Sequence, residues 1–424
     1  MLDSALPKLT RRTMRRTTFS SLLLTLALVG PAAGQEDPAL RRAREILRQA
    51  PLVDGHNDTP MLIREHAKGD VGAYDLRERA PHETDLARLR EGQVAAQFWS
   101  VWIPSVEQGS ARLQLEQIDL ARRMIAAYPE ALVFATRADD IVAAHRAGKI
   151  ASFLGGENGR ALENSLGALR AYYDLGMRYM TLTHGRGTDW ADSATDEARH
   201  GGLTPFGREV VREMNRLGML VDVSHVSPAV MRQVLDLSEA PVIFSHSSAR
   251  ALTDHPRNVP DDVLARLRTN GGVVMVTWVP PFVSTKVMQW SGPLELKMQG
   301  AKTIGDIQRL LAEREAELGP APKATLSDVA DHVEHAARVA GVDHVGLGAD
   351  FAGMGGPVGL EDVSRYPHLF AELVRRGWKD EDLKKLAGLN LVRAMRGAEA
   401  AATRLQKERQ ASTAVFEALA GPKK

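Results

Sequence analysis

Seven ionisable residues follow short apolar runs of the sequence, and their side chains are of the kinds that bind divalent metal ions in proteins. They are His56, Asp58, Glu157, His184, His225, His246 and Asp350. The chain has no cysteine, so a bound metal ion must be held by His, Asp or Glu. Imidazole and carboxylate ligands together suit zinc or a similar divalent ion. These residue types predict a metal centre.

The spacing of these residues predicts two metal ions that share a ligand. His56 and Asp58 are two residues apart, so on an extended segment both side chains point to the same side. His225 and His246 follow neighbouring predicted strands and can hold a second ion, and the two oxygens of Glu157 can bridge the pair. Two ions about 3.5–4 Å apart would acidify a shared water molecule and polarise a substrate carbonyl group.

Each residue also has a simpler explanation when it is taken alone. A His-x-Asp pair is common in turns, and Glu157 lies among glycines that suit an ordinary loop. His225 and His246 fit as buried core histidines, and Asp350 fits as a helix cap. The metal-site interpretation is favoured because all of these residues fall at the same kind of position along the chain.

Short apolar runs alternate with segments of helical periodicity, which indicates a parallel sheet with crossover helices. The predicted strands are residues 52–55, 94–102, 150–154, 179–182, 220–224, 242–245, 273–277 and 344–349. Eight such units are typical of an α/β fold, the TIM-type (β/α)8 barrel of the metal-dependent hydrolase kind. The seven ionisable residues fall at C-terminal strand ends, where barrel active sites are assembled.

Two helices between these strands can be predicted in detail. Leu115, Ile118, Ala121 and Ile125 recur at helical spacing and are predicted to share a buried face. Ser327 is predicted to cap the helix that follows it.

The chain is predicted to have three parts. Residues 1–34 form a signal peptide, residues 35–400 form the barrel domain, and residues 401–424 form a C-terminal helix and tail. Residues from about 279 to 322 contain two consecutive prolines and a charged stretch. We expect this segment to be an insertion over the barrel mouth, not a second domain.

The leader has the layout of a secretory signal. Basic residues up to Arg16 precede an apolar run over residues 19–29 and small residues at 32–34. The apolar run is too short to span a bilayer comfortably. We therefore expect export to the periplasm or the extracellular space, with no transmembrane anchor after cleavage. An uncleaved anchor is the alternative, and the Sec and twin-arginine routes both stay open.

Eight local runs occur in a distinctive order along the chain. They are Asp54-Gly55-His56-Asn57-Asp58, Gln97-Phe98-Trp99-Ser100-Val101, Gly156-Glu157, Leu182-Thr183-His184, Asp222-Val223-Ser224-His225, Ser245-His246-Ser247-Ser248-Ala249, Arg257-Asn258-Val259-Pro260-Asp261-Asp262 and Asp350-Phe351. Together they resemble the membrane dipeptidases, the renal dipeptidase-like zinc peptidases. The resemblance extends from Val53 to about Arg396.

This resemblance implies zinc-dependent hydrolysis of dipeptides with two Zn²⁺ ions per chain. His56 and Asp58 resemble the ligands of one zinc ion. His225 and His246 resemble the ligands of the other, and Glu157 resembles the bridging carboxylate.

The resemblance also implies roles for residues around the metal ions. Asp350 is similar to the family's acid/base, which takes a proton from the bridging water and delivers it to the leaving amine. His184 resembles a histidine that contacts the substrate near the scissile bond. Arg257 resembles the arginine that pairs with the substrate's free carboxylate. Phe282 stands where the family often has a substrate-contacting tyrosine, which puts the family's substrate preference in doubt for this chain.

Two other functions remain open at this point. One is an amidohydrolase or lactonase that acts on a different carboxylate-bearing substrate, and the other is a non-catalytic barrel. The net charge of +1 argues against nucleic acid as a partner. The expected partner is a dipeptide substrate, and a homodimer is left open.

Overall fold

The structure is a computed structural model that describes residues 37–105, 108–298, 304–353 and 355–419. By its internal contacts the chain divides into Met1–Asp37 and Pro38–Lys424, and every element below belongs to the second unit. The expected signal peptide, residues 1–34, lies outside the described residues. Within the described ranges, no helix combines the length and the apolar character needed to cross a bilayer.

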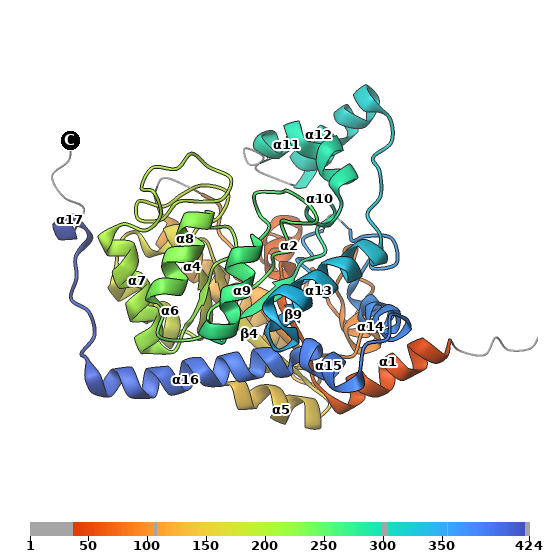
Figure 1. The fold of residues 1–424 in the computed structure, drawn as a ribbon, viewed down its shortest axis with the longest axis horizontal. Helices are drawn as coiled ribbons and strands as arrows, with labels where there is room; N and C mark the ends of the chain where they lie inside the picture. The colour runs from red at the N-terminus through yellow and green to blue at the C-terminus, as the bar shows by residue number, and fades with distance from the viewer. Residues whose placement is uncertain (1–36, 106–107, 299–303, 354, 420–424) are drawn as a thin grey trace, which may run out of the picture. The chain divides into compact units, whose positions relative to one another are not determined.

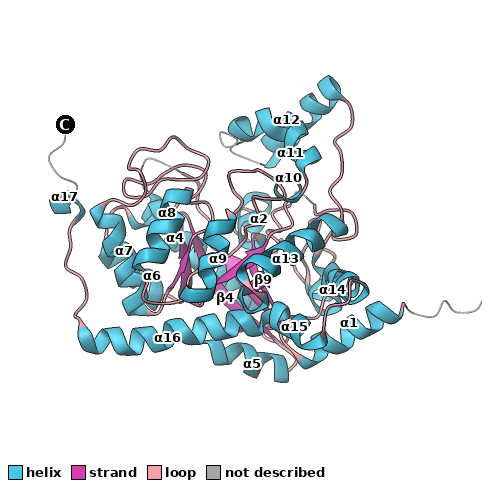
Figure 2. Ribbon diagram, viewed as in Figure 1, coloured by secondary structure: helices cyan, strands magenta, loops and turns pink. Residues whose placement is uncertain are grey.

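Parallel strands form one sheet, drawn in magenta inside the helices in Figure 2. They are β1 (Leu52–Asn57), β2 (Val94–Ser100), β3 (Leu132–Phe134), β4 (Ile150–Glu157), β5 (Met177–Thr181), β6 (Leu220–Asp222), β7 (Ile243–Phe244), β8 (Val273–Val276) and β9 (Val345–Leu347). Their order is β2-β1-β9-β8-β7-β6-β5-β4-β3, and an additional pairing of β2 with β4 closes eight of them into a ring. The predicted TIM-type (β/α)8 barrel is confirmed.

The strand ends differ from the prediction by up to three residues, and one strand was not predicted. The short strand β3 was not predicted, although it lies in a run of five apolar residues, 131–135; it pairs with the start of β4 and is a ninth strand outside the ring. The strand β7 ends at Phe244, one residue earlier than predicted. It ends there because the backbone N–H of Ser245 donates to the side chain of Asp222 at 2.9 Å and not to a neighbouring strand.

Helices surround the strands (Figure 1). The α-helices are α1 (Pro38–Gln49), α2 (Thr59–Ala67), α3 (Leu86–Glu91), α4 (Ser110–Ala127), α5 (Ala138–Arg146), α6 (Leu166–Asp174), α7 (Pro205–Leu217), α8 (Pro228–Leu237), α9 (Asp261–Asn270), α10 (Pro280–Val283), α11 (Thr285–Met298), α12 (Ile304–Leu318), α13 (Leu326–Ala340), α14 (Tyr366–Arg375), α15 (Asp380–Lys384), α16 (Asn390–Glu408) and α17 (Phe416–Leu419). Shorter helical turns are η1 (Gly159–Leu162), η2 (Val342–His344), η3 (Val363–Arg365) and η4 (Lys385–Leu389). In Figure 1, α10, α11 and α12 lie on the upper side of the barrel and α16 runs along the lower side.

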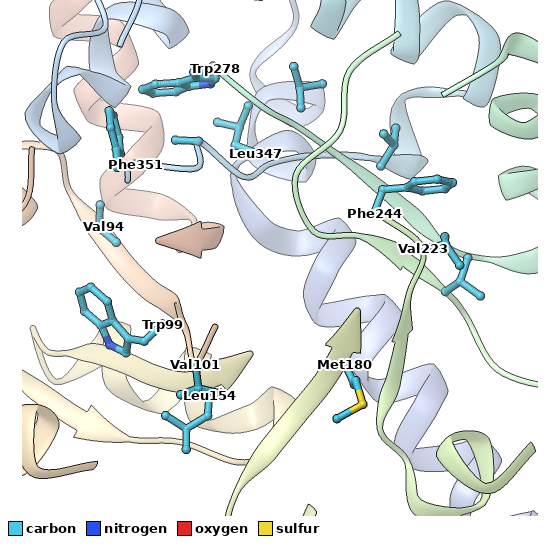
Figure 3. Packing of buried hydrophobic residues seen from close by; sticks show 14 of the residues in the cluster. Val94, Trp99, Val101, Leu154, Met180, Val223, Phe244, Trp278, Leu347 and Phe351 are labelled. Atoms are coloured by element: carbon cyan, nitrogen blue, oxygen red, sulfur yellow. The ribbon is translucent and has the colours of Figure 1, made fainter. Parts of the chain in front are cut away.

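Buried apolar side chains hold the strands in place (Figure 3). Trp99 of β2, Leu154 of β4, Met180 of β5 and Leu347 of β9 are all inaccessible to solvent. Burying a large apolar side chain contributes roughly 1.5–3 kcal/mol. The strand ends that carry the ionisable residues therefore project from a closely packed core.

Two details of the helices correct the sequence prediction. Leu115 of α4 is 48% exposed, and its neighbour Gln114 is buried instead. The Gln114 amide donates to the carbonyl of Val101, just beyond β2, at 2.9 Å, so a hydrogen bond replaces the expected apolar contact. Helix α13 is capped by Thr325, and Ser327 lies inside its first turn.

A buried histidine of α13 is predicted to make folding stability depend on pH. His332 is 1% exposed, and its Nδ1 accepts the backbone N–H of Ala249 at 3.0 Å. Burial lowers the pKa of His332 to about 4, against about 6.5 for an exposed histidine. Between these values the unfolded chain binds a proton that the folded chain does not. The stability contributed by His332 is therefore complete above pH 6.5 and is lost as the pH falls towards 4, by about 3 kcal/mol in all.

Urea unfolding at several pH values would measure this effect. The change His332→Asn is expected to flatten the fall in unfolding free energy between pH 6.5 and 4, and the exposed His66 supplies the matched control, His66→Asn. Equal slopes for the wild type and the His332 variant would contradict the assignment.

Candidate metal centre

The seven ionisable residues singled out in the sequence all lie at the C-terminal ends of barrel strands. His56 is in β1 and Asp58 follows it, Glu157 ends β4, His184 follows β5, His225 follows β6, His246 follows β7 and Asp350 follows β9. Because the carboxyl ends of parallel strands meet at one face of a barrel, the fold brings these side chains together.

Glu157 lies at the centre of the cluster, and its two oxygens face different partners. Oε2 is 3.2 Å from Nε2 of His56. Oε1 is 3.0 Å from Nε2 of His225 and 3.5 Å from Nε2 of His246. Ser100, at the end of β2, donates from its hydroxyl to Glu157 Oε2 at 3.1 Å. The carboxylate is thus held with one oxygen towards each side of the cluster.

Two further carboxylates lie on the His56 side. Asp58 Oδ2 is 3.6 Å from Nε2 of His56, and Asp350 Oδ1 is 3.9 Å from the same atom. The side chain of Asp58 is 7% exposed and that of Asp350 is 17% exposed. Carboxylates crowded into so sheltered a space repel one another, and a cation among them would relieve the repulsion.

The donor atoms fit a divalent metal ion. Ligand atoms lie within 4.8 Å of one another in three overlapping groups, which are His56/Glu157/His246, Glu157/His184/His225 and His56/Asp58/Asp350. Two buried atoms, His56 Nε2 and Asp58 Oδ1, have no hydrogen-bond partner among the described residues. Buried polar atoms are nearly always paired, so unsatisfied nitrogen and oxygen atoms among such ligands indicate a place for a cation.

Two of the seven residues have left-handed backbone conformations, which are uncommon outside glycine. The φ angle is 64° at His225 and 65° at Asp350. The carbonyl of His225 accepts the N–H of Ala194 at 2.7 Å, the hydroxyl of Thr183 at 3.1 Å and the hydroxyl of Ser193 at 3.3 Å. Such strain persists where surrounding contacts hold it and is typical of functional sites.

His184 lies on the open side of the cluster. Its ring stacks on that of His225 with the centroids 4.3 Å apart, and its Nε2 is 3.6 Å from Oε1 of Glu157. The side chain of His184 is 29% exposed, against 10% for His225. His184 is therefore near enough to contact either an ion or a molecule bound beside it.

Arg257 is buried in the loop between β7 and α9 and lies beside the same cluster. It is 3% exposed, and its Nη2 is 3.4 Å from the carbonyl oxygen of His246. Its guanidinium carbon lies 5.4 Å from the ring centroid of Phe282 in α10. A fixed, sheltered guanidinium can bind a carboxylate through two parallel hydrogen bonds.

Glu157 and His225 are held in the protonation states that metal binding requires. Burial alone would raise the pKa of Glu157, but His56 and His225 outweigh it, and the pKa lies well below its ordinary value. Burial, followed by the charge of Arg257, holds the pKa of His225 well below the usual range. An ionised carboxylate beside a neutral imidazole is the state in which both bind metal ions. His56 differs: burial would lower its pKa, but Tyr179, Glu157 and Asp58 outweigh burial and raise that pKa well above its usual value.

The pKa of the Asp350 carboxyl is raised, whereas that of Glu157 is lowered. Burial raises the pKa of Asp350 to about 7, against the opposing charge of His56 and with support from Asp58 and Glu157. A pKa near the working pH is the value at which a group transfers protons most effectively.

Comparison with known proteins identifies the family of the chain. The model of the family described as membrane dipeptidase, peptidase family M19, matches residues 40–409. The chain belongs to the membrane dipeptidase family. It is therefore a metallopeptidase that hydrolyses peptide bonds, and the alternative of a non-catalytic barrel is set aside.

Members of the membrane dipeptidase family cover most of the chain. Mouse dipeptidase 3 is 43% identical over 372 residues, which are 86% of this chain and 68% of the mouse protein. Human dipeptidase 3 is 42% identical over 84% of this chain and 67% of its own length. Among solved structures, the M19 metallopeptidase dipeptidase AC has a TM-score of 0.68 at 25% identity, over 82% of this chain and 98% of its own.

A second solved structure has the same fold. A metallopeptidase from Rhodobacter sphaeroides, liganded with a phosphinate mimic of the dipeptide L-Ala-D-Ala, has a TM-score of 0.68 at 23% identity. It covers 82% of this chain and 99% of its own.

The sequence analysis did not identify three residues whose hydroxyl groups contact the proposed metal ligands. Ser100 contacts Glu157, Tyr179 contacts His56 and Ser245 contacts His246. Ser100 and Ser245 lie in runs that carry the family resemblance, and Tyr179 begins a predicted strand. A hydroxyl-bearing residue inside a barrel strand was the available signal, but such residues are common in strands for packing reasons.

Proposed function

We propose that this member of the family is a two-zinc dipeptidase that hydrolyses the amide bond of an unblocked dipeptide. The observation that carries the proposal is the position of Glu157, whose Oε2 faces His56 while its Oε1 faces His225 and His246. A carboxylate with its two oxygens divided between two sets of ligands is suited to bridge two cations.

In this proposal His56 and Asp58 hold one zinc ion, His225 and His246 hold the other, and Glu157 binds both. When bound, two such ions acidify a shared water molecule and polarise the scissile carbonyl group. The unsatisfied buried atoms of His56 and Asp58 support this assignment.

Asp350 and His184 would handle the proton and the developing charge. The Asp350 carboxylate would take a proton from the attacking water and give it to the leaving amine, and its position 3.9 Å from Nε2 of His56 places it beside the proposed ions. His184 lies on the open side of the cluster, where it can stabilise the charge that develops on the carbonyl oxygen.

Arg257 would recognise the substrate's free carboxylate. Its buried guanidinium beside the backbone of His246, a proposed metal ligand, suits a substrate that carries a free carboxylate. The Rhodobacter sphaeroides metallopeptidase with its phosphinate mimic of L-Ala-D-Ala supports a D-residue on the C-terminal side as one that this site accepts.

A comparison of substrates tests this function against its rival, an amidohydrolase or lactonase. The zinc-supplemented protein would be assayed with L-Ala-D-Ala, with other unblocked dipeptides, and with simple amides and lactones that carry a carboxylate. Hydrolysis confined to dipeptides is expected. Turnover of lactones or simple amides alone would replace the dipeptidase assignment by the rival.

The leader predicts where the mature protein begins. Because residues 1–34 have the order of a secretory signal, we expect the exported protein to start near Gln35 and to be found outside the cytoplasm. N-terminal sequencing of the exported protein checks this. An intact Met1 in the membrane fraction would instead identify an uncleaved anchor.

A further inference from the structure

Two of the histidines assigned to the metal ions contact a buried hydroxyl group on the side away from the cluster. Nδ1 of His56 is 2.8 Å from the hydroxyl of Tyr179, and Nδ1 of His246 is 2.8 Å from the hydroxyl of Ser245. The opposite nitrogens, both Nε2, face Glu157 at 3.2 and 3.5 Å. Each imidazole thus lies between a hydroxyl and the carboxylate assigned as the bridge.

The hydrogen bonds of Tyr179 determine which nitrogen of His56 carries the proton. The Tyr179 hydroxyl donates to the carbonyl of Gly55 at 3.2 Å, and a carbonyl can only accept. A phenol has one proton to give, so its oxygen is left to accept from His56. The proton of the neutral ring is therefore on Nδ1, and the lone pair of Nε2 faces the cluster.

Ser245 fixes the position of the proton on His246 in the same way, and a carboxylate accepts the Ser245 hydroxyl. The Ser245 hydroxyl lies 2.6 Å from Oδ2 of Asp222. The Asp222 carboxylate, fully buried, also accepts the backbone N–H groups of Ser224 and Ser245 and the hydroxyl of Thr181. Because four groups donate to the Asp222 carboxylate, the carboxylate acts only as an acceptor. The Ser245 hydroxyl therefore donates its proton to Asp222, and its oxygen accepts from Nδ1 of His246.

The barrel makes room for this arrangement at a glycine. A Cβ atom at Gly155 of β4 would lie 2.1 Å from Cζ and 2.3 Å from the hydroxyl oxygen of Tyr179. No real Cβ atom approaches so closely, so any other residue at position 155 would displace the phenol from His56.

We propose that Tyr179 and the Ser245–Asp222 pair are positioning residues, which hold His56 and His246 in the one tautomer that can bind a metal ion through Nε2. The inference rests on the proposed function, since it takes both histidines as ligands. Partners on the far side of a ligating histidine fix its tautomer and orientation, and losing one commonly lowers metal affinity about 10–100-fold. None of these three residues touches the substrate in this scheme.

Zinc affinity of the folded, full-length protein tests the proposal. The variants Tyr179→Phe and Ser245→Ala remove one hydroxyl each, and competition with a chelator at buffered free zinc measures how tightly each ion is held. Each variant is expected to bind one of its two zinc ions about 10–100-fold more weakly than the wild type.

Matched controls separate this effect from a general loss of packing. Tyr172 and Ser152 are equally buried, and each donates its hydroxyl to a backbone carbonyl, that of Ala161 at 2.8 Å and that of Ile150 at 3.3 Å. Tyr172→Phe and Ser152→Ala are expected to keep the wild-type zinc affinity. Thermal unfolding of all metal-free variants reports any difference in folding.

Wild-type zinc affinity in both Tyr179→Phe and Ser245→Ala would overturn the inference and leave the proposed function standing. A wild-type protein that binds no zinc would instead overturn the proposed function itself.

A second measurement needs no variant. In the zinc-loaded wild type, nitrogen NMR is expected to show protected N–H protons at Nδ1 of His56 and His246, and a ring bound to zinc through Nδ1 would contradict the proposal.

Discussion

Replacing Asp350 by asparagine is expected to lower kcat by roughly 10²–10⁴-fold, the usual contribution of a general acid or base, while both metal ions stay bound. The substitution removes the group proposed to carry the proton and keeps its size. Asparagine also tolerates a left-handed backbone better than most residues, so the φ angle of 65° at this position can be maintained. Steady-state kinetics together with metal analysis of the same sample measures both quantities.

Asp58 supplies the contrasting variant for this prediction. Asp58→Asn alters a proposed ligand and is expected to lower both metal content and activity. If Asp350→Asn retained most of its activity with both ions bound, another residue would have to move the proton.

Replacing Arg257 by alanine is expected to lower kcat/KM for unblocked dipeptides by about 10²-fold or more. Arg257 is 3% exposed, and truncating one partner of a buried charge pair commonly costs about 2–5 kcal/mol. Each 1.4 kcal/mol corresponds to about a tenfold change. Dipeptides whose carboxylate is blocked as an amide should already be poor substrates, so the substitution should affect them much less.

This difference between free and amidated substrates is the informative result. Arg250 lies in the same loop, and its guanidinium donates to backbone carbonyls of that loop. Arg250→Ala therefore controls for loss of loop order and is expected to change both substrates by the same factor. Equal cleavage of free and amidated dipeptides by the wild type would show that the carboxylate is not recognised.

The positions of the metal-binding candidates could be predicted because barrel strands buried on both faces form continuous apolar runs. A histidine or carboxylate at the end of such a run, as at Glu157 or His246, stands out in the sequence. The strand ends then meet at one face by the rules of the fold, so no knowledge of side-chain packing was needed.

The supporting residues could not be predicted in this way. Tyr179 and His56 are 123 positions apart, and their contact depends on the exact register of β5 and β1 and on the missing side chain at Gly155. The same limit explains the wrong prediction for the buried face of α4. Leu115 was expected to be buried but is exposed, because the buried neighbour Gln114 donates to the carbonyl of Val101. Apolar periodicity carries no information about such pairings.

The dependence of dipeptide hydrolysis on bound zinc tests the central claim most directly. Metal-free protein would be titrated with zinc while the hydrolysis of an unblocked dipeptide is followed. Because the proposal assigns His56 with Asp58 to one ion and His225 with His246 to the other, around a shared Glu157, activity is expected to rise until two equivalents are bound and then to stay constant. Full activity at one equivalent, or no hydrolysis at any loading, would contradict the two-zinc dipeptidase.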